Sequence, residues 1–437
     1  VIHRVIRLGD TDACMYLIDG FCKDELMQKI LQYLMDLKAE DFPKDAHEMS
    51  KIAIPYVEVD LDDTWEKILG ALLSGVFVLL LDGYEKAVLI DARTYPARGV
   101  EEPDKDKVLR GSKDGFVETV VFNTALIRRR IRSTDLHMEM LNAGENSRTD
   151  IVLCYMESRV DPKLLTQIRE RIRSIQVDAL AMNQESLAEC LYQRKWYNPF
   201  PKFKYTERPD TAAQVLEGNL VILVDNSPSA MILPTTIFDV VEEADDYYFP
   251  PVTGTYLRLT RFLIALLTYF VTPTYLLLMN HRMWIPENLE FIILKEDPNV
   301  PLILQFLLLE LAIDGLRLAA VNTPNMLSTP LSVMAALVLG EFSVESGWFS
   351  SEVMLAMAFV AIANYTQANY ELGYALKFMR ILNLILTQLF GILGYIAGLI
   401  IFALALLTNK TISGQSYLYP LIPFDLSLIH ISEPTRP

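Results

Sequence analysis

Three ionisable side chains interrupt an otherwise apolar stretch from Pro301 to Val321. They are Glu310, Asp314 and Arg317, spaced four and three residues apart, so a helix would carry all three on one face. Ionisable groups at membrane depth cost free energy and usually face a bundle interior or a water-filled path. The stripe is therefore a candidate ion path. An ion pair between Asp314 and Arg317 that fixes helix packing is an equally good explanation, because the two hypotheses differ only in whether water reaches the stripe.

Two further acidic residues, Glu341 and Glu345, lie between short apolar segments at about 331–344 and 352–364. Segments of this length are too short for simple membrane spans and favour re-entrant or broken helices. Broken backbone persists at membrane depth only beside protein or a water-filled cavity. We therefore add both carboxylates to the ion-path candidates, although aqueous loop ends would have the same composition.

The helices that must position these residues form a predicted membrane domain at 255–423. Full spans are expected at about 262–279, 301–321 and 381–407, the first without any charged residue. Gly391, Gly394 and Gly398 in the last span allow close helix approach, within the chain or between subunits. Arginine and lysine before the first and last spans place the preceding part in the cytoplasm. These residues are Arg258, Arg261, Lys377 and Arg380.

The part before the membrane domain alternates strand and helix signals and is predicted to be an α/β module of two subdomains, at 1–92 and 93–254. An internal repeat supports this division. The segments 75–91 and 218–234 share a glycine, a buried strand, an aspartate, a polar turn and a second strand. We predict two matching hairpins, each preceded by a helix, with chance similarity of two buried hairpins as the alternative.

Composition excludes several classes of function. The 437 residues include 39 Lys and Arg against 55 Asp and Glu, a net charge of -16, which is unsuited to binding nucleic acid. The four cysteines and five histidines are scattered without ligand spacing, so we expect no metal and no cofactor. Gly111-SKDG lacks the pattern of a phosphate-binding loop, and no catalytic residues stand out, so we expect no enzyme.

The two ends of the sequence carry separate expectations. The chain starts at Val1 without an apolar leader, so no secretory signal is expected. From about Leu426, the tail resembles a translated sequencing adaptor. We expect residues 424–437 to be non-native and leave them out of fold reasoning.

Five ordered blocks carry a family resemblance along nearly the whole chain. They are DGYEKAVLIDAR from Asp82, GSKDGFVETVVFNTALIRRRIRS from Gly111, LEGNLVILVD from Leu216, DDYYFPP from Asp245 and NYELGYALKFMRI from Asn369. Together they resemble the A-subunit family of bacterial spore germinant receptors. Within that family, the sequence of the second block is most similar to the branch whose genes lie beside those of the spore's dipicolinic-acid channel proteins.

The resemblance implies a protein of the spore inner membrane whose α/β module is cytoplasmic. Its implied partners are the lipid bilayer, further copies of itself and other germination membrane proteins, and its implied role is a cation-conducting channel during germination. A non-conducting scaffold or signal-relay subunit is the alternative from another class. A secondary transporter is the third hypothesis, disfavoured because no repeat relates two membrane halves.

Overall fold

The computed structural model describes most of the chain in two compact units, Val1–Gly99 and Val100–Pro437. The described residues are 1–18, 21, 24–38, 42–93, 99–103, 106–192, 195–295, 297–323, 333, 335–367 and 369–423. The expected non-native tail and part of the first short apolar segment lie outside them.

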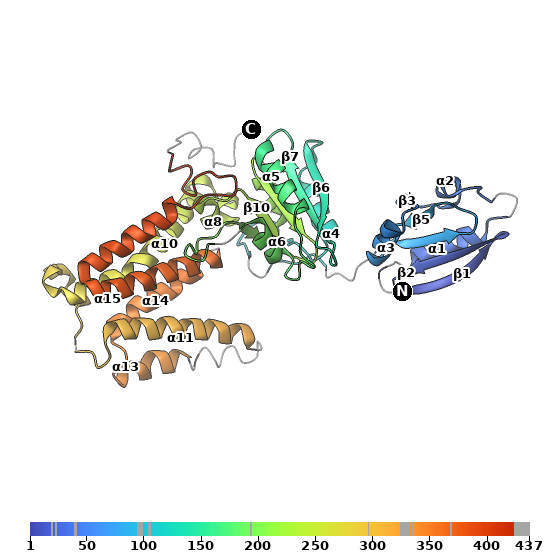
Figure 1. Cartoon of the computed structure of the whole chain (residues 1–437). Helices are drawn as coiled ribbons and strands as arrows, with labels where there is room; N and C mark the ends of the chain where they lie inside the picture. Colours follow the sequence, from blue (N-terminus) through green and yellow to red (C-terminus); the bar gives the residue numbers. More distant parts are fainter. Residues whose placement is uncertain are drawn as a thin grey trace. The chain divides into compact units, whose positions relative to one another are not determined.

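The first unit is an antiparallel five-stranded sheet with helices on both faces (Figure 1). In sheet order its strands are β1 (Ile2–Leu8), β2 (Thr11–Leu17), β4 (Phe77–Leu81), β5 (Ala87–Ile90) and β3 (Val59–Asp62). Its helices are α1 (Asp24–Met35), α2 (Ala46–Glu48), the π-helix η2 (Met49–Ala53) and α3 (Trp65–Leu73). Side chains alternate along β4, so that Leu79 packs in the core with α1 while Val78 packs with α3.

The second unit begins with a sheet of the same kind. In sheet order its strands are β6 (Leu136–Ala143), β7 (Thr149–Met156), β9 (Leu220–Val224), β10 (Ala230–Leu233) and β8 (Lys204–Thr206). One face is covered by α5 (Pro162–Arg173) and α6 (Gln184–Leu191), and the other by α4 (Val120–Arg130) and α7 (Pro209–Val215). Most of the buried residues in both cores are leucine, isoleucine and valine.

The predicted hairpin repeat is confirmed by strand register. Phe77 pairs with Ile90 in the first sheet, and Leu220 pairs with Leu233 in the second, so both partners shift by the same 143 positions. The turns correspond as well, because Gly83 and Asn226 both have positive φ, of 84° and 60°. Glycine and asparagine tolerate that conformation best. The repeat extends to the whole sheet, since the two strand orders are equivalent.

A helical region follows the second sheet. It contains α8 (Ile237–Val241), α9 (Asp245–Tyr248), α10 (Pro251–Asn280), the 3-10 helices η3 (Arg282–Trp284) and η4 (Glu287–Ile292), α11 (Leu302–Asn322), the π-helix η5 (Ala336–Phe342), α13 (Ser343–Glu345), α14 (Ser351–Tyr365) and α15 (Tyr370–Leu407). Among the described helices, α10 and α15 are long and apolar enough to cross a membrane. The boundary expected at 254 falls inside the first turn of α10.

The expectation of one continuous span at 381–407 is wrong, because α15 reverses direction at Gly391. That residue has φ 60° and ψ −133°, a conformation open to glycine alone. A β-carbon at Gly394 would overlap Leu386, and one at Gly398 would overlap Asn383, so the two arms of α15 lie against each other (Figure 1). The glycines therefore serve packing within the chain. Hydropathy misses the reversal because the apolar residues continue through it.

The two arms of α15 form a helical hairpin, which we call the α15 hairpin, and it packs along α10. The Tyr269 hydroxyl donates to the Gly398 carbonyl over 3.0 Å, and its ring stacks on Phe402 with centroids 4.1 Å apart. The arms, 370–390 and 392–407, are about 31 Å and 24 Å long. Their lengths approach the hydrocarbon thickness of a bilayer, about 30 Å.

Candidate functional site

A buried ion pair joins α11 to the first arm of α15. Glu310 Oε1 accepts hydrogen bonds from Arg380 Nη2 at 2.5 Å and Nε at 2.9 Å. Glu310 is 3% exposed and Arg380 is fully buried. Arg380 Nη1 also donates to the Thr268 carbonyl in α10 over 3.0 Å, so one guanidinium holds three helices together.

A second ion pair, between Asp314 and Lys377, lies beside the first. Lys377 is buried and its ammonium also reaches the Glu310 carbonyl at 3.2 Å and Glu310 Oε2 at 3.4 Å. Two carboxylates thus face two cations. We call these four residues the charged cluster: Glu310, Asp314, Lys377 and Arg380. Its equal numbers of opposite charges offset part of the cost of removing them from water.

Arg317, the third residue of the predicted stripe, has different partners. Its guanidinium lies 5.5 Å from the ring centroid of Tyr365 and 5.4 Å from that of Tyr374, both cation–π distances. Within the described residues no ion pair joins it to Asp314. The hypothesis of an Asp314–Arg317 pair is therefore wrong, because Lys377 from the facing helix occupies that carboxylate.

The other two candidates lie apart from the charged cluster. Glu341 in η5 and Glu345 in α13 are both exposed. In the described part of the chain, neither carboxylate pairs with a cation of α15. The structure brings Glu310 and Asp314 together with cations and leaves Glu341 and Glu345 outside.

Sequence reasoning missed the role of Lys377 and Arg380, which it placed before the last span as a sign of cytoplasmic orientation. Both lie inside α15, which begins at Tyr370. Their spacing of three was the available signal, because it places both cations on one helical face, as the spacing of four does for Glu310 and Asp314. Arg380 lies about 15 Å along its arm, near half the thickness of a bilayer core.

The arginines before the first span also have acidic partners. Arg258 pairs with Glu242 at 3.1 Å, and Arg261 pairs with Asp246 at 2.7 Å. Both arginines are in the first half of α10. Acidic residues of the α8–α9 segment therefore neutralise much of the positive charge at the beginning of α10.

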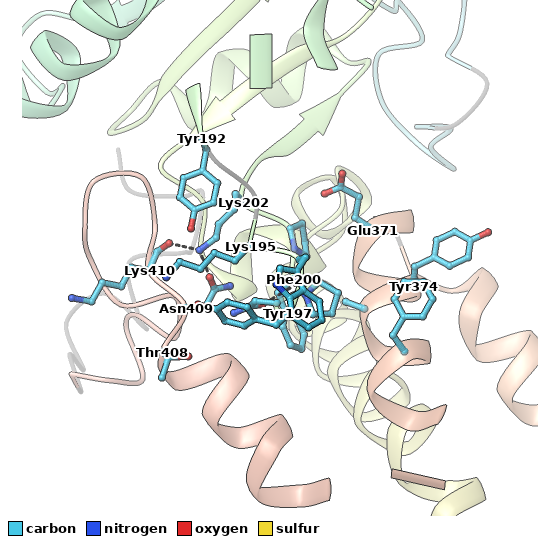
Figure 2. A pocket seen from close by; sticks show the side chains of 16 residues that line it. Tyr192, Lys195, Tyr197, Phe200, Lys202, Glu371, Tyr374, Thr408, Asn409 and Lys410 are labelled. Atoms are coloured by element: carbon cyan, nitrogen blue, oxygen red, sulfur yellow. Dashed lines mark hydrogen bonds between the residues drawn. The ribbon is translucent and has the colours of Figure 1, made fainter. Parts of the chain in front are cut away.

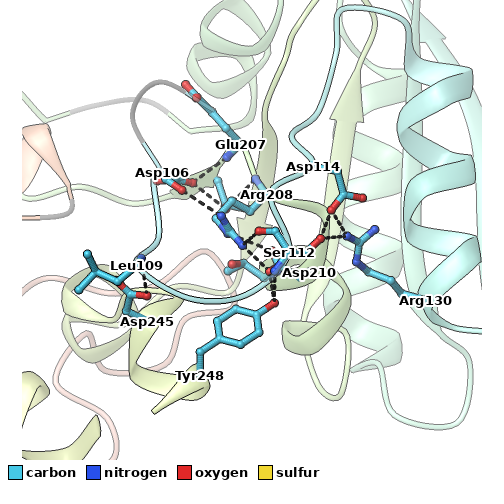
Figure 3. Close-up of polar contacts among 12 residues, drawn as sticks. Asp106, Leu109, Ser112, Asp114, Arg130, Glu207, Arg208, Asp210, Asp245 and Tyr248 are labelled. Atoms are coloured by element: carbon cyan, nitrogen blue, oxygen red, sulfur yellow. Dashed lines mark hydrogen bonds and ion pairs between the residues drawn. The ribbon is translucent and has the colours of Figure 1, made fainter. Parts of the chain in front are cut away.

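A polar junction connects the second sheet to the start of the helical region (Figure 3). Arg208 is buried and donates to the Ser112 carbonyl and to Asp210 Oδ2, each at 2.6 Å. Asp210 in turn accepts from the Tyr248 hydroxyl of α9. Gly111, at φ 123°, packs so closely on Tyr248 that a β-carbon would overlap its ring.

The same junction explains Gly111-SKDG and the arginine run after it. Burial raises the pKa of Asp114, but hydrogen bonds from Arg130 and Ser112 outweigh it and lower the pKa to about 2. Arg130 and Arg129 both pair with this carboxylate, at 2.6 and 2.5 Å. In this fold the loop that begins at Gly111 has a structural role, because ion pairs fix it against α4.

Comparison with known proteins agrees with the family resemblance of the five sequence blocks. The pattern of the family described as Bacillus/Clostridium GerA spore germination protein matches residues 1–435. The chain belongs to the GerA family. It is a spore germination protein of the germinant receptor A-subunit type, and the expected family is confirmed.

Individual GerA-family relatives match over nearly the full chain. Stage V sporulation protein AF of Bacillus subtilis (strain 168) is 39% identical, covering 97% of this chain and 86% of the relative. Uncharacterized membrane protein YfkQ of the same strain is 30% identical, covering 97% and 83%. Spore germination protein KA is 27% identical, covering 97% and 79%. The sequence GSKDGFVE predicted similarity to the branch encoded beside the dipicolinic-acid channel proteins. The first of these relatives confirms that prediction.

A solved GerA-family structure is also similar in sequence. It is the crystal structure of the N-terminal domain of the A subunit of the Bacillus megaterium spore germinant receptor GerK3. The match has 27% identity and a TM-score of 0.23, and covers 53% of this chain and 87% of that one.

Proposed function

We propose that this GerA-family protein is a membrane subunit of a spore germination complex and that its copies assemble into a cation-conducting channel. The observation that carries the proposal is the charged cluster, buried about halfway along an apolar helix. Ionisable groups in such positions usually mark ion pathways. The membrane is the spore inner membrane, and the sheet-containing module lies on its cytoplasmic side.

Exposed apolar side chains support the membrane assignment. Leu263 and Leu266 on α10, and Leu389, Phe390 and Leu393 on α15, are each more than half exposed. In water, these surfaces would be costly to leave uncovered. Lipid tails or neighbouring copies of the chain cover them in this proposal.

Asp314 is the carboxylate best placed to meet a cation. Its side chain is 30% exposed, whereas that of Glu310 is 4% exposed. With Lys377 paired to Asp314, the cluster has no net charge and attracts no cation, which fits a resting state. Movement of α15 against α11 would free the Asp314 carboxylate to stabilise a passing cation at a constriction.

Reconstitution in liposomes tests the channel. We expect Asp314→Asn to lower monovalent-cation flux per assembled complex while membrane abundance and oligomer yield change less. Glu290→Gln is the matched control, because Glu290 is an exposed acid in η4 away from the cluster. Loss of oligomer at unchanged flux per complex would contradict an ion path at Asp314.

A non-conducting scaffold or signal-relay subunit is the second candidate. The balance of two carboxylates and two cations favours it, because such a cluster can hold α10, α11 and α15 together without any ion passing. Intact oligomers without flux under any germination stimulus would support this role. The test therefore separates conduction from assembly.

A further inference from the structure

A pocket of about 840 Å³ lies where the two ends of the α15 hairpin meet the segment that leads into β8 (Figure 2). Glu371 and Tyr374 line it from the start of α15, and Asn409 and Lys410 line it from just beyond the end. The opposite wall comes from the segment 195–202. The pocket is thus at the level where the apolar arms begin and end.

Its charge is opposite to that of the whole chain. Three lysines line the pocket against one glutamate, in a protein of net charge -16. The lysines are Lys195, Lys202 and Lys410. Lys195 and Lys410 are exposed to solvent, and the Lys195 ammonium lies 5.9 Å from the ring centroid of Tyr197.

Lys202 is a buried cation held by neutral groups. Its ammonium donates to the Asn409 side chain and to the Lys410 carbonyl, the latter over 2.6 Å, and lies 4.9 Å from the ring centroid of Tyr192. Among the described residues, no carboxylate pairs with it. Burial, and then the nearby charge of Lys195, lowers the pKa of Lys202 to about 8. A buried cation without a counter-charge favours an anionic ligand beside it.

Aromatic side chains at the rim indicate the kind of anion. Trp196 is 94% exposed and Tyr197 is 59% exposed, next to Lys195. Tryptophan and tyrosine are enriched where membrane meets water, because each has an apolar ring and a polar group. Phe378, 54% exposed on α15, extends the apolar surface from the pocket along the helix.

We propose that this pocket binds the phosphate-bearing headgroup of an anionic phospholipid. The inference rests on the proposed membrane location of α10 and α15. The lysines contact the phosphate, Trp196 and Tyr197 lie at headgroup level, and the acyl chains run along the exposed face near Phe378. The lipid thereby links the 195–202 segment to both ends of the α15 hairpin.

Native mass spectrometry of the full-length protein tests the site. The purified protein is delipidated in detergent and offered equal amounts of phosphatidylglycerol and phosphatidylcholine. We expect preferential retention of phosphatidylglycerol. Lys195→Gln and Lys410→Gln should each lower the preference about fivefold, the effect of one lysine near an anionic surface. Lys163→Gln, an exposed lysine on α5 outside the pocket, is the control and should leave the preference unchanged.

Three outcomes would overturn the proposal. One is equal retention of both lipids by the unmodified protein, and another is the same loss in Lys163→Gln as in the pocket variants. The third is displacement of phosphatidylglycerol by inorganic phosphate at equal concentration, which would identify a soluble anion as the ligand. Failure of the membrane assignment is distinguishable, because the protein would then stay soluble and monodisperse without detergent.

Discussion

Glu310 and Arg380, 70 positions apart in the chain, form a buried ion pair in the helical region. Such a pair contributes little net stability compared with apolar residues of similar size, but loss of one partner leaves the other charge buried and uncompensated. The relationship makes the two positions strongly interdependent.

A double-mutant cycle should show this dependence. Arg380→Leu or Glu310→Leu alone is expected to lower stability by about 3 to 5 kcal/mol, while the double variant should be markedly more stable than either. Thermal unfolding of the detergent-purified protein measures the cycle, with Glu345→Gln as an exposed acidic control. Additive losses in the double variant would show that the pair does not act as a unit.

The α15 hairpin gives a second prediction, based on two glycines of the same helix. Gly398→Ala should lower stability by about 1 to 3 kcal/mol, because the new β-carbon overlaps buried Asn383. Gly373→Ala has open space around it and should raise stability by about 0.5 to 1 kcal/mol. Thermal unfolding compares the two. Equal effects at both positions would be incompatible with arms that pack at Gly398.

Lys202 predicts a pH dependence in the alkaline range. Its pKa in the fold, about 8, is below the unfolded value of 10.5, so the unfolded chain binds more protons between these pH values. Stability should therefore gain from this residue as pH rises from 8 towards 10.5. Lys202→Met should remove that gain, which thermal unfolding at stepped pH would detect. Lys163→Met controls for loss of a lysine charge, and the same flattening there would contradict the assignment.

Asp114 predicts a dependence of stability on pH in the acidic range. Its pKa, about 2 in the fold and 3.8 when unperturbed, means that its stabilising effect is complete above pH 3.8 and lost as pH falls towards 2. Asp114→Asn should cost about 1 to 2 kcal/mol at neutral pH. The difference from the unmodified protein should shrink towards pH 2 in thermal unfolding. A difference that stays constant across this range would exclude the ionised carboxylate as its cause.

Part of the fold was accessible from sequence because local pattern determines it. The matched spacings from Gly75 and Gly218 predicted two hairpins, and their registers agree with that repeat. Buried strands appear in the sequence as runs of apolar residues, and residues that tolerate positive φ occur at the turns between them. The helices α10 and α11 likewise followed from their apolar lengths.

Helix periodicity depends only on spacing along one element, so the spacing of Glu310 and Asp314 was enough to place them on one helical face. Which residues would face them was decided by tertiary structure. Lys377 and Arg380 reach the carboxylates because α15 begins well before its most apolar stretch and packs against α11. The reversal at Gly391 was equally invisible, since a glycine in an apolar run is compatible with a straight helix and with a turn. The backbone angles of Gly391 and the contacts of Gly394 with Leu386 and of Gly398 with Asn383 distinguish the two, and those contacts arise between segments that helix periodicity treats as independent.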